Sequence, residues 1–412
     1  MRAYMTLRRS LVGVGVVVLV IALGWGLLAA RGQQPGSSAL FGPLFEAYQR
    51  IKSNFYRPEN APDARLLNGA IEGMVKTLGD PYSRYLPAEE YRQFNEGFEK
   101  EVVEEFGGLG MQIEVRDGKL LVVAPLHDTP ASRAGIEAGD WIIEINGEST
   151  EGITQEQAVK KLRGPKGTSV TLKVRREDGS ERVFEIVRDI ITIKIVSHSV
   201  LAGGQVGYIQ VYTFNTMTRA DVEKALKDLL GRGVKGLILD LRNNPGGLLT
   251  QAVDLASLFI DDGPVLKVQS RNGSEVYNSR GNRYPNLPLA VLVNRGTASA
   301  AEIVAGAIRD HQMGVLFGKR TFGKGVIQTS FTLSDGSALL LTTAEYFTPK
   351  GYRVHEVGIT PDVIVERESD VLPKALQWVL EHLGRYCPCL PPVQYDRSAR
   401  ARPSPVLIWF EP

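Results

Sequence analysis

The 412-residue sequence contains only two cysteines, Cys387 and Cys389, and they lie in one Cys-Pro-Cys near the C-terminal end. A disulfide between them would close a very small ring that contains proline, so it would be strained. The sequence also lacks a Cys/His cluster, an H-E-x-x-H motif, a phosphate-binding P-loop and a G-x-G-x-x-G that opens a helix. We therefore expect no metal, no cofactor and no catalytic cysteine.

An excess of charge of either sign is also absent. The chain has 48 basic and 46 acidic residues, a formal net charge of +2, and 43% hydrophobic residues. Scattered charges of both signs give no reason to expect nucleic-acid binding. The length leaves room for two or three globular domains.

The N-terminus carries an apolar run over residues 11–30, preceded by Arg2, Arg8 and Arg9. Twenty helical residues at about 1.5 Å each span a hydrocarbon core of about 30 Å. Basic residues mark the cytoplasmic side. We predict a signal anchor, with residues 1–10 in the cytoplasm and the chain beyond the linker 31–40 in the periplasm or cell envelope. The alternative is a cleaved signal peptide, but a cut after Ala30 would leave Leu28 where a small residue is preferred.

The stretch 289–328 has the pattern of a strand, a helix, a second strand and a glycine-rich turn. Ser299 stands at the start of the helix. One interpretation is a capping box with Glu302. The other is a nucleophile whose developing oxyanion faces the positive end of the helix, with the Ala300 N–H as a donor.

A serine nucleophile needs a base. His311 is the nearest histidine in sequence, but twelve helical residues place it roughly 18 Å from Ser299. Lys324 follows the next strand and stands between two glycines. A lysine kept away from water in this place can be neutral and act as the base.

These residues carry a family resemblance. The segments VLVNRGTASAAEIVAGAI and GKRTFGKGVIQ resemble the carboxyl-terminal processing peptidases, which are serine peptidases with a Ser/Lys dyad. The resemblance implies Ser299 as nucleophile, Lys324 as base and Gln328 as the residue that orients the lysine. Many members have S-A-S-A-S-E where this chain has T-A-S-A-A-E, with the middle serine kept.

Gln328 can reach the lysine amine only if the chain turns. Positions 324 and 328 are about 13 Å apart on a strand and roughly 6 Å apart on a helix. We therefore expect a single helical turn after Gly323.

A second glycine-rich turn, 243–247, follows the apolar strand 236–242. Its N–H groups at a helix start suit an anion. In the family, this D-L-R-x-N-x-G-G turn supplies the second oxyanion donor, which the resemblance assigns to Gly246, with Gly247 next. The alternative is a tight turn that needs glycine for structure alone. Asp240 and Arg242 are expected to be structural.

Residues 107–177 resemble a PDZ domain, with Gln155–Leu162 as its second helix. The candidate carboxylate-binding loop consists of Gly108, Leu109, Gly110 and Met111. Its N–H groups can receive a terminal carboxylate while the peptide adds a strand beside the loop. The expected ligands are protein or peptide substrates with free, apolar C-termini.

The predicted fold class is a mixed α+β and α/β multidomain protein. The predicted parts are a helical N-terminal region at 41–98, a β-barrel-like PDZ domain at 99–185, a peptidase core with a βαβ-spiral (crotonase/Clp-protease-like) fold at 186–370, a helix at 371–383 and a Pro/Arg-rich tail at 384–412. The D-P-Y-S-x-Y motif in the helical region also resembles the family, but we expect that region to pack without a chemical role. His355 is expected at the surface.

The predicted function is a serine endopeptidase that recognises the C-terminal ends of exported proteins. One alternative is a non-catalytic PDZ scaffold, which would have lost the serine or the lysine, whereas both are present. Another is a hydrolase or isomerase of small acyl substrates, for which a receptor for chain ends is unnecessary. A homodimer is left open.

Overall fold

The structure is a computed structural model, and it describes residues 37–99, 103–116, 118–126, 128–192, 195–281 and 284–383. The predicted anchor at 11–30 and the tail at 384–412 lie outside these residues. Among the helices in the described ranges, none is both long and apolar enough to cross a membrane. The chain divides into two compact units, residues 1–74 and residues 75–412.

The first unit is helical, as predicted. It contains α2 (Ser37–Asn54), the short 3-10 helix η1 (Pro58–Asn60) and most of α3 (Asp63–Lys76). The Lys52 ammonium lies 2.7 Å from a carboxylate oxygen of Asp63. The Tyr48 hydroxyl donates to the same oxygen at 3.0 Å. These two contacts join the helices on either side of the turn.

The PDZ domain is confirmed as a lobe of antiparallel strands with its own apolar core. Its main sheet has the order β3-β4-β5-β7-β8, and β6 pairs with β5. A separate ribbon of β2 and β9 stands where the chain enters and leaves the lobe. The elements are β2 (Val103–Gly108), β3 (Met111–Arg116), β4 (Lys119–Pro125), α5 (Pro130–Ala134), β5 (Trp141–Ile145), β6 (Glu148–Ser149), α6 (Gln155–Leu162), β7 (Ser169–Arg175), β8 (Glu181–Val187) and β9 (Asp189–Thr192).

The centre of the second unit is a six-stranded sheet in the order β10-β11-β12-β15-β16-β19. All neighbours are parallel except β10 with β11. Its strands are β10 (Val196–Leu201), β11 (Val206–Val211), β12 (Gly236–Asp240), β15 (Leu289–Val293), β16 (Val315–Gly318) and β19 (Val363–Ile364). The helices beside it are α7 (Thr218–Gly231), α8 (Leu249–Ala256), α9 (Ala300–Asp310) and α10 (Glu368–Glu381).

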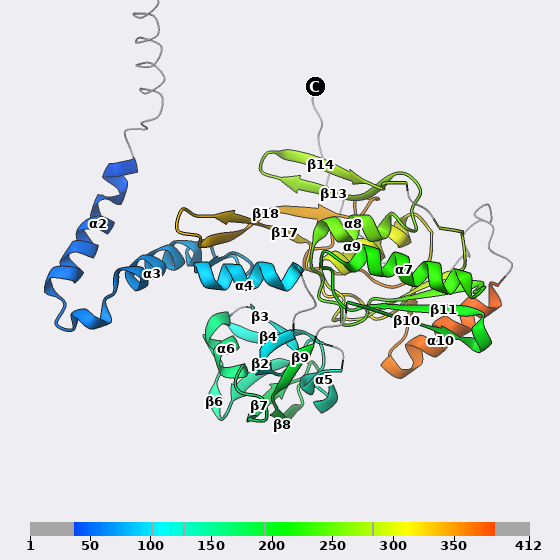
Figure 1. Cartoon of the computed structure of the whole chain (residues 1–412), viewed down its shortest axis with the longest axis horizontal. Helices are drawn as coiled ribbons and strands as arrows, with labels where there is room; N and C mark the ends of the chain where they lie inside the picture. Colours follow the sequence, from blue (N-terminus) through cyan, green and yellow to red (C-terminus); the bar gives the residue numbers. More distant parts are fainter. Residues whose placement is uncertain are drawn as a thin grey trace, which may run out of the picture. The chain divides into compact units, whose positions relative to one another are not determined.

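Helices cover both faces of this sheet, which explains why β12 and β15 are buried throughout. Leu237 and Leu239 pack with α7, α8 and α9 on one face. Ile238 lies between them in sequence and packs with α10 on the other face. This alternation follows from the two-residue period of a strand. Figure 1 shows α10 on the opposite side of the strands from α7 and α9.

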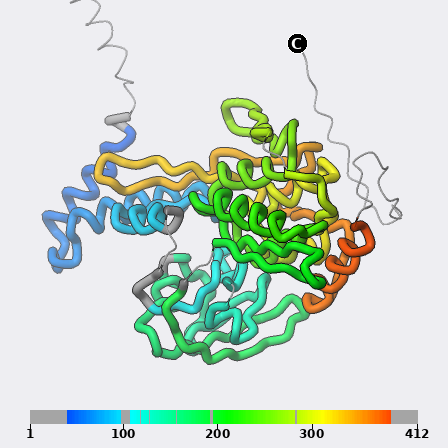
Figure 2. Tube along the Cα trace, turned by 45° about the vertical axis from the view of Figure 1, so that its right-hand side comes forward, coloured from blue at the N-terminus to red at the C-terminus, as the bar shows by residue number. Residues whose placement is uncertain are grey.

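A second, antiparallel sheet contains β1 (Arg84–Leu86), β13 (Pro264–Ser270), β14 (Gly273–Asn278), β17 (Val326–Thr332) and β18 (Ala338–Phe347). The strands β17 and β18 form an antiparallel hairpin. The strand β1 follows the D-P-Y-S motif and pairs with β18, with Arg84 opposite Leu340. Helix α4 (Ala88–Glu99) then runs beside the hairpin (Figure 2). There the Tyr91 hydroxyl donates to the Ser330 hydroxyl at 3.3 Å.

Two predicted segments differ from the structure. The last helix is α10, which begins three residues earlier than the predicted 371–383. The expected helical turn after Gly323 is wrong, because the chain is irregular there and becomes β17 at Val326. The hydrogen bonds available from β18 favour an extended chain at this place.

Candidate active site

Ser299 stands where the buried strand β15 passes through a short loop into α9. Its backbone has φ 54° and ψ −118°, a conformation that residues with a side chain rarely adopt. Such strain costs of order 1–3 kcal/mol and is found most often at functional sites. The strained serine at a helix start is therefore the first structural sign of a nucleophile.

Glu302 ties the Ser299 segment to the Lys324 segment. It is fully buried. One carboxylate oxygen accepts from the Ser299 N–H at 2.8 Å and the Lys324 N–H at 2.9 Å. The other accepts from the Thr321 hydroxyl and from the Gly323 N–H at 2.8 Å. Burial raises the pKa of Glu302 to about 7, and the four hydrogen bonds act in the opposite direction.

The capping interpretation of Ser299 is also confirmed, because Ser299 and Glu302 form a capping box in which the Ser299 N–H donates to the Glu302 carboxylate at 2.8 Å. Capping and nucleophilic roles are therefore compatible in one residue.

Tyr346, on β18, joins the same two segments from the other side. Its hydroxyl lies 3.1 Å from the Ser299 carbonyl oxygen and 3.0 Å from the Lys324 carbonyl oxygen. The side chain is 1% exposed, and burial raises the pKa of the phenol. Because Tyr346 stays neutral, it can donate to these carbonyls at any ordinary pH.

Lys324 has the environment that a neutral lysine base requires. Burial lowers the pKa of its ammonium, whereas the nearby carboxylates of Glu114, Asp80 and Glu302 raise it, and Arg84 lowers it further. Its amine lies 4.9 Å from the centre of the Tyr82 ring. Within the described ranges, no hydrogen bond joins this amine to Ser299.

Gln328 is not placed against the lysine amine in this structure. It lies on β17 just after a β-bulge, and its amide donates to the Thr342 hydroxyl at 3.4 Å. The helical turn that would bring it close to Lys324 does not form, since β17 pairs with β18 from Val326 onward. Its predicted role stays a prediction.

The predicted oxyanion residues do meet. A Cβ added to Gly246 would lie 2.7 Å from the Ser299 Cβ and 2.9 Å from the Ala300 nitrogen, so only glycine fits there. Gly246 also has φ 98°. However, its N–H donates to the Asn244 side-chain oxygen at 2.9 Å. The Ala300 N–H, by contrast, donates to no acceptor among the described residues.

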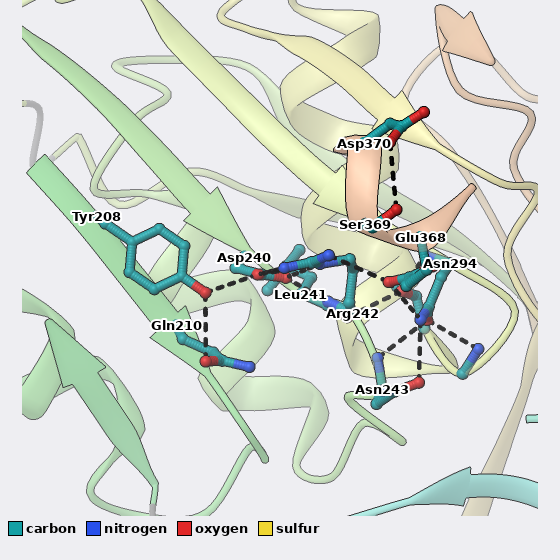
Figure 3. A network of polar contacts seen from close by, with 12 residues as sticks. Tyr208, Gln210, Asp240, Leu241, Arg242, Asn243, Asn294, Glu368, Ser369 and Asp370 are labelled. Atoms are coloured by element: carbon teal, nitrogen blue, oxygen red, sulfur yellow. Dashed lines mark hydrogen bonds and ion pairs between the residues drawn. The ribbon is translucent and has the colours of Figure 1, made fainter. Parts of the chain in front are cut away.

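A buried ion-pair network supports the turn that carries Gly246 (Figure 3). Arg242 contacts Asp240 at 2.5 Å and Glu368 of α10 at 3.1 Å. Asn294, ahead of Ser299, exchanges hydrogen bonds with Asn243 at 2.9 and 3.0 Å. Asp240 and Arg242 thus lie in a network that joins the two loops of the site to α10.

Tyr82 is the site residue that the sequence prediction missed. The pairing of β1 with β18 carries Tyr82 of the D-P-Y-S motif to Lys324, and the expectation that the motif packs without a chemical role stays a prediction. Arg116 of the PDZ strand β3 donates to the Tyr82 hydroxyl at 3.4 Å. His355, expected at the surface, is half-buried and meets the Tyr82 ring in an edge-on contact, with ring centres 6.2 Å apart.

The candidate chain-end site lies in the PDZ lobe. Gly108 ends β2, Leu109 is buried, Gly110 has φ 69°, and Met111 begins β3. Strand β3 is at the edge of the PDZ sheet. The Gln155 side chain of α6 donates to the Ile113 carbonyl of β3 at 3.4 Å. The loop is therefore followed by an edge strand beside a helix, as a PDZ groove requires.

No group of three or more His, Cys, Asp or Glu side chains in the described part of the chain could hold a metal ion. His311, at the far end of α9, contacts the Pro264 carbonyl at 2.7 Å and lies in a different part of the core from Lys324.

Comparison with known proteins agrees with this arrangement. Residues 205–365 match peptidase family S41, residues 100–175 match the PDZ domain, and residues 31–90 match the N-terminal domain of the activating protease CtpB. The chain is 40% identical over 352 residues to the carboxy-terminal processing protease CtpA of Bacillus subtilis, covering 85% of this chain and 74% of the relative. It is 39% identical over 337 residues to a carboxy-terminal-processing protease of Bartonella bacilliformis, covering 80% and 75%.

A solved structure, the photosystem II D1 C-terminal processing protease, superposes with a TM-score of 0.67 at 31% identity. The match covers 82% of this chain and 96% of that protein.

Proposed function

The chain belongs to the carboxyl-terminal processing proteases of peptidase family S41, and we propose from this premise that it is an endopeptidase in which Ser299 and Lys324 form the catalytic dyad. One observation carries the assignment. A strained serine at the start of α9 and a half-buried lysine are attached by their main chains to the same carboxylate, that of Glu302. This attachment keeps the nucleophile and the base in one rigid unit.

In the proposed reaction, the Ser299 hydroxyl attacks the scissile carbonyl while neutral Lys324 takes its proton. The lysine ammonium then gives this proton to the leaving amine, and a water molecule repeats the sequence to release the acyl group. Burial lowers the pKa of Lys324, so at a given pH a larger fraction of its amine is neutral than for a lysine in water. The neutral amine can then accept the proton of the Ser299 hydroxyl.

The Ala300 N–H is the proposed first oxyanion donor, and Gly246 supplies the second. Removal of one such donor typically costs about 3 kcal/mol of transition-state stabilisation. The Gly246 N–H can serve only when it leaves Asn244 for the more strongly negative oxyanion. Gln328 would likewise have to leave Thr342 to orient the lysine amine. Both changes are local side-chain or turn movements.

The substrate class follows from the PDZ lobe. The loop Gly108–Met111 and the edge strand β3 suit a free chain end with an apolar terminal residue. We propose that this lobe holds the C-terminal end of a protein substrate, and that cleavage upstream of it processes or degrades exported proteins.

The dyad is tested by replacing its members one at a time. Ser299→Ala and Lys324→Ala should each reduce cleavage of a protein substrate to background, with circular dichroism and thermal unfolding unchanged. His311→Ala is the control and should cleave at the normal rate, because His311 contacts only a distant carbonyl. Turnover by Lys324→Ala at more than a few per cent of the normal rate would contradict the Ser/Lys assignment.

A membrane location is a further part of the proposal, and it is supported by the apolar run at residues 11–30 behind Arg2, Arg8 and Arg9. The full-length protein should sediment with membranes and resist extraction by salt. Protease added outside the cytoplasmic membrane should digest it. A mature N-terminus at Arg31 would show instead that the segment is removed as a signal peptide.

A further inference from the structure

We propose that the aromatic face of Tyr82 takes part in catalysis by stabilising the ammonium that Lys324 becomes when it accepts the Ser299 proton. The inference rests on the proposed dyad and assigns a further residue to it. Tyr82 lies 217 positions before Ser299, in the segment that leads into β1.

The contact is direct. The Lys324 amine lies 4.9 Å from the centre of the Tyr82 ring, within the roughly 6 Å over which a ring attracts a cation. The negative potential of the ring face favours the charged lysine over the neutral one. Tyr82 thus contacts the Lys324 amine, which is the proton-accepting group. It does so from the segment that leads into the antiparallel sheet.

The ring is held from three sides. The Asp80 carboxylate accepts from the Tyr82 N–H at 3.2 Å. Arg116 donates to the Tyr82 hydroxyl at 3.4 Å, and the His355 ring lies against the Tyr82 edge. The next residue, Ser83, accepts from the Thr342 N–H at 3.0 Å, which attaches the segment to β18. A ring fixed in this way needs no reorganisation when the lysine becomes charged.

Such a contact offsets part of the effect that burial has on the Lys324 ammonium. Desolvation favours the neutral form of Lys324, but a lysine that is desolvated alone binds a proton poorly and is a weak base. A general base works best when its pKa lies near the working pH. The Tyr82 face restores part of the lost stabilisation of the ammonium, without placing a full negative charge beside the nucleophile.

The other charged groups around Lys324 are Asp80 and Arg84 beside Tyr82, Glu114 of β3 and Glu302 of α9, with His355 beyond the ring. Of these, Glu114 and Arg84 act in opposite directions on the lysine. A substitution that keeps the size of the Tyr82 ring moves none of these charged groups. The contribution of the ring face to the stability of the Lys324 ammonium can therefore be measured separately.

The first experiment compares Tyr82→Phe with Tyr82→Leu over a full pH profile of kcat/KM, using a peptide substrate. Tyr82→Leu removes the aromatic face, and a cation–π contact of about 1.4 kcal/mol corresponds to about tenfold. We expect an about tenfold lower kcat with KM nearly unchanged, and an acid limb that moves to lower pH by about one unit. Tyr82→Phe keeps the face and loses the contacts of the hydroxyl with Arg116 and Glu114, so its acid limb should stay in place with a loss of about twofold in kcat.

The matched control is Tyr91→Leu, which makes the same chemical change on α4, where the hydroxyl contacts Ser330 and no catalytic residue. Its acid limb should coincide with that of the unmodified enzyme. If Tyr82→Leu has an unmoved acid limb, whatever its rate, the proposal is overturned.

A second experiment keeps the proposal testable if Tyr82→Leu does not fold. Replacement of Tyr82 by phenylalanines with increasing numbers of ring fluorines weakens the negative ring face at nearly constant shape. The acid limb should move stepwise to lower pH with each fluorine, and an unchanged limb would overturn the proposal. Failure of the dyad itself would appear differently, as activity that persists in Ser299→Ala or Lys324→Ala.

Discussion

The Lys324 N–H donates to the same Glu302 oxygen that accepts the Ser299 N–H. The main chains of the base and of the nucleophile are thus both hydrogen-bonded to one buried carboxylate. Glu302 lies one helical turn after Ser299, so its position is fixed by α9. The glycines on either side of Lys324 let this segment pass close to residues 355–358, since an added Cβ would lie 2.9 Å from the Gly358 nitrogen at Gly323 and 2.3 Å from the His355 nitrogen at Gly325.

Glu302→Gln should damage both activity and stability. An amide has only one acceptor oxygen, so its NH2 group would face two donors that now point at a carboxylate oxygen. Each buried donor left without an acceptor costs about 1–3 kcal/mol. We expect kcat to fall at least about a hundredfold and the thermal midpoint to drop by several degrees. The control Glu381→Gln lies on the exposed part of α10 and should change neither quantity.

Gly246→Ala should inactivate the enzyme. The new methyl group would lie 2.7 Å from the Ser299 Cβ, at a backbone φ of 98° that alanine rarely adopts. Burst kinetics with an activated ester should show loss of acylation by about a hundredfold or more. Gly231→Ala, at the end of α7 where an added methyl meets nothing within 4 Å, is the matched control. Normal acylation by Gly246→Ala would contradict the placement of this turn beside Ser299.

The pH dependence should follow the proton on Lys324. Only the neutral amine can act as base, so the rate should rise with pH through the pKa of the lysine and level off above it. Burial lowers that pKa, whereas the Glu114 carboxylate raises it. Glu114→Gln removes the raising effect, so the acid limb should move to lower pH. Glu151→Gln, on an exposed PDZ turn, should leave the limb in place, and a shift of the Glu114→Gln limb to higher pH would contradict the assignment.

Substrates with a free C-terminal carboxylate should be cleaved faster than the same chains with an amidated end. Amidation removes the charge that the N–H groups of the loop Gly108–Met111 would receive. The difference should appear mainly in KM, since the carboxylate is bound far from the bond that is cut. It should disappear when residues 107–177 are deleted. Equal KM values for acid and amide in the intact enzyme would show that the loop does not read the chain end.

The sequence predicted the parts of the site that lie on local motifs. Ser299 and Glu302 are one helical turn apart, and the glycines around Lys324 mark a turn, so short-range spacing was sufficient. Gly246 was assigned to the site by the family resemblance, and the structure places it beside Ser299.

The missed features depend on long-range pairing. Tyr82 reaches Lys324 only because β1 pairs with β18, more than 250 residues later in the chain. The bulge between Ile327 and Gln328 decides which way Gln328 points, and nothing in the sequence marks it. The competition between Asn244 and a substrate oxyanion for the Gly246 N–H likewise arises from the shape of one turn. The positive φ of Ser299 could also not be predicted from the sequence.

The ribbon of β2 and β9 pairs Val103 with Thr192 and Gly108 with Asp189. Paired residues on neighbouring strands have Cα atoms only about 5 Å apart, so the chain leaves the PDZ lobe almost where it entered. The PDZ lobe is therefore an insertion in the peptidase chain, and the two ends of this insertion lie side by side. A linker of a few residues can bridge this gap without stretching the core, but a chain shortened in this way also loses Glu114 and Arg116, which act on Lys324 and Tyr82.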